Sequence, residues 1–103
     1  MGTKMPTYVS LFQKTDEGRV LTLEDTQRRR TRWKEIVKRR GGEIKGLYYG
    51  FGQYDIVAIV EVPDTESIAK VQLAYEQMGL THVESFEVFE ADEWDIILED
   101  ALV

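Results

Sequence analysis

The stretch from residue 52 to residue 64, GQYDIVAIVEVPD, constrains the fold more than any other part of the chain. A turn with flanking glycines leads into seven residues, Ile56 to Val62, of which six are apolar, and a proline and an aspartate close the run. Isoleucine, valine and alanine without regular alternation are typical of a strand that is covered on both faces. We therefore predict a central strand here, with the other elements packed around it.

The composition is that of one globular domain. The chain has 103 residues, of which 43% are hydrophobic and 31% are charged. It has no cysteine, which excludes a disulfide framework, a thiol nucleophile and a cysteine metal site. No apolar run approaches the roughly 18 residues of a membrane span, and no signal-peptide core follows the start, so we expect a cytoplasmic protein. We interpret residues 1–4 as an N-terminal extension or expression remnant and residues 5–103 as a single domain.

The charge is distributed unevenly along the chain. Residues 1–50 hold twelve Lys and Arg against six Asp and Glu, or +6, whereas residues 51–103 hold one against thirteen, or −12. Such an asymmetry is typical either of a nucleic-acid-binding half or of two halves that neutralise each other.

Six further segments accompany the central strand. In order along the chain, we predict a strand over residues 7–13, a helix from about residue 22 to Arg40, a strand over 43–50 with a bulge at Gly46, the central strand, a helix from about residue 65 that ends at Gly79, a strand over 81–89 and an acidic helix from Ala91. This order, β-α-β-β-α-β plus a short C-terminal helix, predicts an α+β ferredoxin-like fold with a four-stranded antiparallel sheet.

In such a fold both main helices cover the same face of the sheet. We expect Tyr8, Ser10 and Phe12 to contribute to the uncovered face, because they alternate with Val9 and Leu11. An uncovered aromatic face on so small a protein predicts burial by a partner, most simply a second copy. Trp33 is the expected anchor of the first helix on the sheet.

Four motifs in this order resemble the GYD domain family. They are Met5-Pro6-Thr7-Tyr8-Val9, Gly41-Gly42, the run from Gly52 through Tyr54-Asp55 to Glu61, and Phe89 followed by Asp92-Glu93. The resemblance spans about residues 5–98. It implies a dimeric α+β barrel, in which two sheets face each other around a space that can host a small apolar or aromatic ligand, and it implies no established reaction. The first helix is more basic than the resemblance leads us to expect.

Tyr54, Asp55 and His82 are the candidate proton-handling residues. In one interpretation Tyr54 and Asp55 form a polar pair at a cavity mouth, with Asp55 as base and Tyr54 as hydrogen-bond donor. In the other, which we favour, Asp55 binds backbone N–H groups after the turn and the Tyr54 ring packs on the sheet. His82, the only histidine, is expected at an exposed strand end, since no second histidine at ligand spacing supports a metal site.

Five residues are candidates for lining a ligand pocket between the sheet and a partner; the alternative is that they form only the dimer core. These are Tyr8, Ser10, Phe12, Tyr48 and Tyr49. We predict no cofactor and no metal.

The first helix holds eight of the thirteen basic residues. They are Arg28, Arg29, Arg30, Arg32, Lys34, Lys38, Arg39 and Arg40. Nucleic-acid binding is one interpretation, but the overall negative charge opposes it, and we expect no nucleic-acid partner. The simpler interpretation is a solvated face partly neutralised by the acidic C-terminal helix, within one chain or between chains.

The sequence thus favours a non-catalytic homodimer or higher oligomer that assembles through the sheet or also binds a small molecule. The alternative is a small cofactor-independent oxygenase or isomerase that uses the cavity between two sheets. No phosphate loop, Ser–His–Asp order or nucleophile elbow supports hydrolytic chemistry, and we expect binding rather than catalysis.

Overall fold

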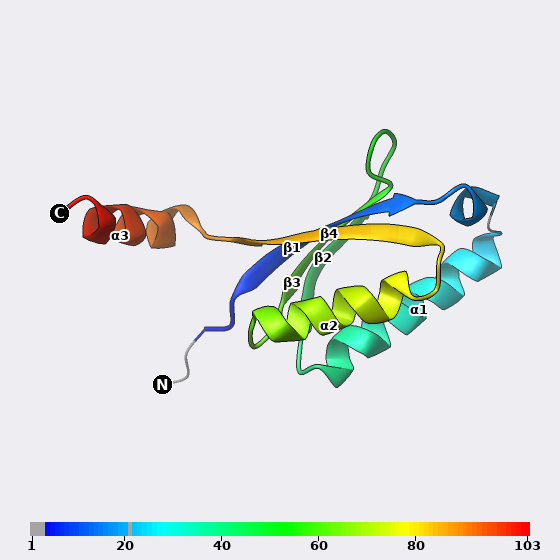
Figure 1. Ribbon diagram of the computed structural model, residues 1–103, viewed down its shortest axis with the longest axis horizontal. Coiled ribbons are helices and arrows are strands. Elements are labelled where there is room, and N and C mark those ends of the chain that lie inside the picture. The colour runs from blue at the N-terminus through cyan, green and yellow to red at the C-terminus, as the bar shows by residue number, and fades with distance from the viewer. Residues whose placement is uncertain (1–3, 21) are drawn as a thin grey trace.

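The computed structural model describes residues 4–20 and 22–103, so residues 1–3 of the predicted extension lie outside the described part. A single four-stranded antiparallel sheet with strand order β2-β3-β1-β4 carries two helices on one face (Figure 1). The elements are β1 (Thr7–Lys14), the 3₁₀ helix η1 (Glu17–Val20), α1 (Leu23–Arg39), β2 (Glu43–Tyr49), β3 (Ile56–Glu61), α2 (Thr65–Glu76), β4 (Thr81–Val88) and α3 (Ala91–Ala101). The predicted ferredoxin-like α+β architecture is confirmed; η1 was not predicted.

The predicted central strand is β3, which lies between β2 and β1. Its burial alternates, because Ile56, Ala58 and Val60 are buried under the helices while Val57 and Ile59 are half-buried. The apolar side chains on both faces fit the sequence pattern, but the described chain covers only one of those faces.

The core lies between the sheet and helices α1 and α2. Trp33 is 4% exposed and meets the edge of the Phe12 ring with the ring centroids 5.7 Å apart. Tyr75 of α2 meets Phe12 in the same edge-on manner at 5.6 Å. Trp33 is therefore the anchor that the sequence predicts, with Phe12 between the two helices' aromatic residues.

The helix ends follow the capping signals in the sequence. Thr22 accepts a hydrogen bond from the Asp25 backbone N–H, and Asp25 accepts one from the Thr22 N–H, which completes a capping box at the start of α1. Gly41 ends this helix with φ of +74°, a conformation that favours glycine. The sheet register shifts between Ile44 and Gly46, which confirms the predicted irregularity in β2.

One prediction about β1 is wrong. Tyr8, Ser10 and Phe12 are 2–3% exposed and lie on the helix-covered face, whereas Val9 and Leu11 face the other way. Both sets of alternate residues contain large apolar side chains, so hydrophobicity alone did not decide the face. The larger aromatic rings fill the volume between sheet and helices, where Trp33 and Tyr75 receive them.

The opposite surface of the sheet, which we call the open face, is covered by no helix of the described chain (Figure 1). Its apolar residues are half-buried, except Phe86, which is 45% exposed. They are Val9, Leu11, Val57, Ile59, Phe86 and Val88, and the cross-strand pairing places Tyr48 beside them. An uncovered apolar face is thus present, with aliphatic residues where Tyr8 and Phe12 had been expected.

The C-terminal helix α3 stands apart from this fold. It projects beyond the end of β4 (Figure 1), and none of its residues is buried. Among the described residues, its acidic side chains make no ion pair with α1, so neutralisation of the two helices within one chain does not occur; Lys4 instead contacts Glu90 at 3.1 Å and Glu93 at 3.9 Å.

Candidate functional site

Asp55 holds the start of β3 against β1. Its Oδ2 accepts a hydrogen bond from the Lys14 backbone N–H at 2.8 Å, and its own N–H donates to the Phe12 carbonyl at 2.8 Å. The Arg19 guanidinium lies 3.8 Å from the other carboxylate oxygen. Asp55 thus binds backbone as the structural interpretation expects, and these contacts engage both of its oxygens.

Tyr54 points to a different place, the open face. Its hydroxyl donates to Glu84 Oε2 at 3.1 Å, and this hydrogen bond to a carboxylate raises the pKa of the Tyr54 phenol. Tyr54, Glu84 and the exposed His82 line one shallow hollow of about 120 Å³. The structure therefore brings Tyr54 together with His82 and separates it from Asp55. Glu84 was missed, although its place two residues after His82 on one strand puts both on the same face.

A larger hollow of about 470 Å³ lies on the open face, at the end from which α3 leaves. It combines the apolar surfaces of Ile59 and Val88 with a basic and two acidic side chains. The lining residues are Thr7, Lys45, Ile59, Glu61, Val88, Phe89 and Glu90. Lys45 Nζ lies 3.4 Å from Glu43 and 3.9 Å from Glu61, so two carboxylates pair with its charge.

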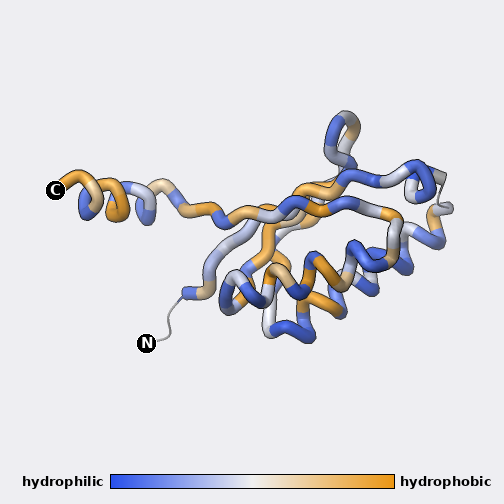
Figure 2. Tube along the Cα trace, in the orientation of Figure 1, coloured by the Kyte–Doolittle hydropathy of each residue, from blue (hydrophilic) through white to orange (hydrophobic). Residues whose placement is uncertain are grey.

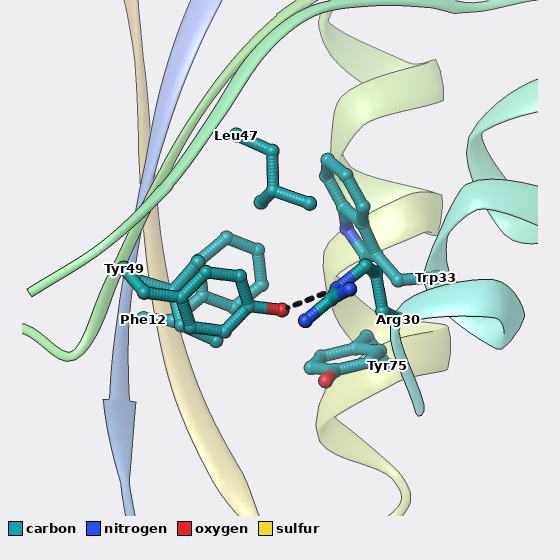
Figure 3. A pocket seen from close by; sticks show the side chains of 7 residues that line it. Phe12, Arg30, Trp33, Leu47, Tyr49 and Tyr75 are labelled. Carbon is teal, nitrogen blue, oxygen red and sulfur yellow. Dashed lines mark hydrogen bonds between the residues drawn. The ribbon is translucent and has the colours of Figure 1, made fainter. Parts of the chain in front are cut away.

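A third pocket lies on the covered side, between the sheet and the helices (Figure 3). Arg30 closes its mouth, since its Nε donates to the Tyr49 hydroxyl at 2.9 Å while its guanidinium lies 5.0 Å from the Tyr49 ring centre. Behind this pair Phe12, Trp33 and Tyr75 leave about 10 Å³, room for about one water molecule. In this conformation the pocket does not admit an organic ligand.

The five predicted pocket residues do not share one cavity. Tyr8 and Ser10 are held under α2 and beside β4, by hydrogen bonds to the Thr65 hydroxyl at 2.9 Å and the Ser85 hydroxyl at 2.8 Å. Phe12 and Tyr49 line the small pocket on the covered side. Only Tyr48, which is 61% exposed, belongs to the open face.

The three consecutive arginines of α1 have three different environments. Arg30, as described above, lies at the mouth of the pocket on the covered side. Arg28 pairs with Asp25 on the helix surface. Arg29 is buried, donates to the Thr81 hydroxyl at 2.9 Å and lies 5.3 Å from the centre of the Tyr75 ring. Sequence reasoning missed this buried arginine, although its position four residues before Trp33 indicates the covered face of the helix.

Two classes of site find no support among residues 4–20 and 22–103. Those residues contain no group of three or more His, Asp or Glu side chains arranged to hold a metal ion. The same part of the chain has no helix of the length and apolarity that crossing a membrane requires.

Comparison with protein families identifies the chain. The model of the GYD domain matches residues 8–98. The chain belongs to the GYD domain family. No significant match was found among curated proteins.

Comparison with solved structures confirms the fold of this GYD domain. Ribosomal protein S6 from Thermotoga maritima superposes with a TM-score of 0.64 at 16% identity, over 96% of this chain and 97% of that one. The C-terminal domain of MgtC from Mycobacterium tuberculosis gives 0.58 at 7% identity, over 85% and 92%. A de novo designed protein, Foldit4, gives 0.53 at 16% identity, over 82% and 97%. Likeness at such identities extends to the fold alone.

Proposed function

We propose that this GYD domain is a homo-oligomeric, small-molecule-binding module of the cytoplasm, in which two copies face each other through their open sheet faces. The observation that carries the proposal is the apolar open face itself. Burying a half-exposed aliphatic side chain contributes about 25 cal/mol per Å² of apolar surface, so pairing two such faces is favourable. Isologous pairing is the commonest way for one chain to cover an apolar surface.

The two hollows on the open face support the ligand-binding part of the proposal. In a face-to-face dimer they would be closed by the second copy, which would turn open depressions into enclosed spaces. Both combine apolar walls with a few polar groups, as small-molecule sites commonly do. A small ligand with an apolar body and one or two polar groups fits this lining best.

The first test is native mass spectrometry of the freshly purified protein, compared with the denatured mass. A dimer, or a multiple of it, that carries additional mass supports both parts of the proposal. A dimer without additional mass supports assembly only, and a monomer contradicts the proposal.

A substitution then locates the interface. Ile59→Lys places a charge at the centre of the open face and is expected to shift the dimer to monomer at micromolar concentration, measured by sedimentation equilibrium. Leu73→Lys is the matched control, because Leu73 is 66% exposed on α2, away from that face. Equal effects of the two substitutions would argue against pairing through the sheet.

A second candidate function is catalysis at the hollow that holds Tyr54, Glu84 and His82. The hydrogen bond from Tyr54 to Glu84 favours it, because a protonated phenol beside a histidine can donate a proton to a bound substrate. If a small molecule co-purifies, its conversion by the wild type and by Tyr54→Phe separates the two functions. Conversion that stops in the variant while binding persists indicates an enzyme; binding without conversion in either protein indicates a binding module.

A further inference from the structure

The C-terminal arm, residues 89–103, has an apolar stripe with no surface of its own chain to cover. Trp94, Ile97 and Leu98 are 38–48% exposed and follow one another at helical spacing, while the acidic residues lie on either side of them. Within the arm the only aromatic contact is between Phe89 and Trp94, at 5.9 Å. Figure 2 shows hydrophobic and hydrophilic residues interspersed along this helix.

A helix of this kind requires a partner surface. Isolated helices shorter than about 12–15 residues are marginal in water, and most helical stability in proteins comes from packing of the apolar face. α3 has 11 residues, and none of them is buried. Burial against the described chain therefore does not account for its helical form.

The opposite chemistry occurs along the edge of the molecule where α1 adjoins β2. We call this surface the basic edge: Tyr49 of β2 with Arg30, Lys34 and Lys38 of α1. The hydrogen bond between Arg30 and Tyr49 shows that this flank of α1 adjoins β2, and Lys34 and Lys38 continue the flank at intervals of four residues. Tyr49 is 46% exposed, whereas its neighbour Tyr48 belongs to the open face on the other side of the sheet. Among the described residues none of the three cations pairs with a carboxylate, whereas Arg28 and Arg32 on the other flank do.

The two surfaces are complementary in charge, in polarity and in length. Residues 90–103 contain six acidic and no basic residues, and the apolar stripe between them matches the exposed Tyr49 ring beside Arg30. At about 1.5 Å per residue α3 is roughly 16 Å long, and at about 3.3 Å per residue β2 is roughly 23 Å long. The edge can therefore seat the whole helix.

We propose that the C-terminal arm of one copy docks on the basic edge of a second copy. Trp94, Ile97 and Leu98 cover the exposed Tyr49 ring, and the flanking carboxylates pair with Lys34 and Lys38. The occupant is a second copy because one sequence supplies both surfaces. Lys4 pairs with Glu90 and Glu93 at the start of α3, but among the described residues no cation pairs with Asp95 or Glu99 farther along it. This contact is separate from the pairing of open sheet faces, so either can exist without the other.

Charge exchange tests the proposal in the full-length protein. One variant carries Lys34→Glu and Lys38→Glu on the edge, and the other carries Asp95→Lys and Glu99→Lys on the arm. Each variant alone is expected to self-associate at least tenfold more weakly than the wild type in sedimentation equilibrium. An equimolar mixture should regain the wild-type affinity, since each arm then meets an edge of opposite charge. All four positions are exposed, and circular dichroism checks that the variants are folded.

Replacing an apolar residue of the stripe supplies a second, independent measurement. Trp94→Ser should weaken self-association at least tenfold and speed amide hydrogen exchange in α3, because Trp94 lies at the centre of the stripe. Ile96→Ser is the matched control, since Ile96 is 67% exposed on the opposite, acidic side of the helix, and it should leave both readouts unchanged.

The outcomes are distinguishable from those of sheet pairing. Sensitivity to Trp94→Ser with insensitivity to Ile59→Lys supports arm docking and contradicts sheet pairing; the reverse result overturns arm docking. Failure of the mixture to recover, or unprotected α3 amides in the wild-type oligomer, also overturns it. A third result would also overturn it: the Lys34→Glu and Lys38→Glu variant loses salt-dependent binding to nucleic acid but self-associates like the wild type. The cations of the basic edge would then bind a polyanion and not the arm.

Discussion

The chain has two tryptophans, and each lies on the apolar stripe of a helix, but the chain buries only one of them. Trp33 of α1 is 4% exposed and packs against Phe12 in the core, whereas Trp94 of α3 is 48% exposed and its ring lies beside that of Phe89 in the arm. Helices α2 and α3 repeat the contrast, since they have 12 and 11 residues, and α2 buries Ile68, Val71 and Tyr75 while α3 buries nothing.

The contrast shows that an apolar stripe indicates a need for burial without indicating which molecule provides it. The helices that the chain itself covers, α1 and α2, connect strands of the sheet and are placed over it by short links. α3 follows β4 and connects it to no other strand of the described sheet, so the topology of that sheet does not place α3 over it. A helix in that position is free to serve a second copy.

The largest expected difference concerns the two tryptophans. Trp33→Ala should lower the free energy of unfolding by about 3–5 kcal/mol, because it removes a buried aromatic ring and leaves a cavity. Trp94→Ala should leave the unfolding free energy of the dissociated monomer nearly unchanged. Urea denaturation of both variants, at a protein concentration too low for association, measures the two effects.

Protein concentration sharpens this comparison. Above the dissociation constant, Trp94→Ala should become destabilising, since the wild type then gains stability from association that the variant lacks. The effect of Trp33→Ala should persist at both concentrations. If Trp94→Ala were equally destabilising in the dilute monomer, the arm would have to fold back on its own chain.

The sequence was sufficient to predict the helices and strands, but not which face of β1 is buried. The signals at Thr22, Gly41 and Asp64 are local, so capping chemistry places the helix ends without knowledge of the rest of the fold. The face of β1 was predicted wrongly because Phe12 and Leu11 are both good core residues, and only the packing with Trp33 selects between them.

The candidate site was predictable only in part. The backbone role of Asp55 follows from its position after a turn, whereas the contact of Tyr54 with Glu84 joins residues thirty positions apart and depends on sheet register. Arg29 could have been found from its helical phase with Trp33, but its charge in a run of three arginines made it look like surface.

A smaller effect is expected at low pH, where the starts of α2 and α3 should respond differently. In α2 the Asp64 side chain accepts a hydrogen bond from the Ser67 hydroxyl at 2.7 Å and one from the Ser67 backbone N–H at 2.8 Å, and these bonds lower the pKa of the Asp64 carboxyl. A carboxyl whose pKa is lower in the folded state contributes stability above its ordinary value of 3.8 and loses it as the pH falls through the folded-state pKa. Asp64→Ala should therefore destabilise at neutral pH and approach the wild type in acid.

Glu90→Ala at the start of α3 is the matched comparison. Glu90 takes part in the capping box of α3 and pairs with Lys4 at 3.1 Å, but these contacts are solvent-exposed and contribute little, and α3 contributes no buried residue to the fold. The variant should unfold like the wild type across the same pH range, as followed by urea titrations at a series of pH values. A pH-dependent loss of stability in Glu90→Ala similar to that in Asp64→Ala would show that α3 is coupled to the folding of its own chain.

The smallest expected effect is a change in tyrosine pKa that differs between the open face and the covered face. The pKa of Tyr54 is raised chiefly by its hydrogen bond to the Glu84 carboxylate, whereas the pKa of Tyr75 is raised chiefly by burial. Glu84→Gln removes the negative charge that opposes ionisation of the Tyr54 phenol, so it should lower the pKa of Tyr54 and leave that of Tyr75 unchanged. NMR titration of ring-labelled tyrosines in the dilute monomer follows both groups, with Tyr54→Phe assigning the signal. In the associated protein the Tyr54 pKa should rise further if the open faces pair, because the second copy then removes water from the phenol; an identical titration at high and low concentration would place Tyr54 outside the interface.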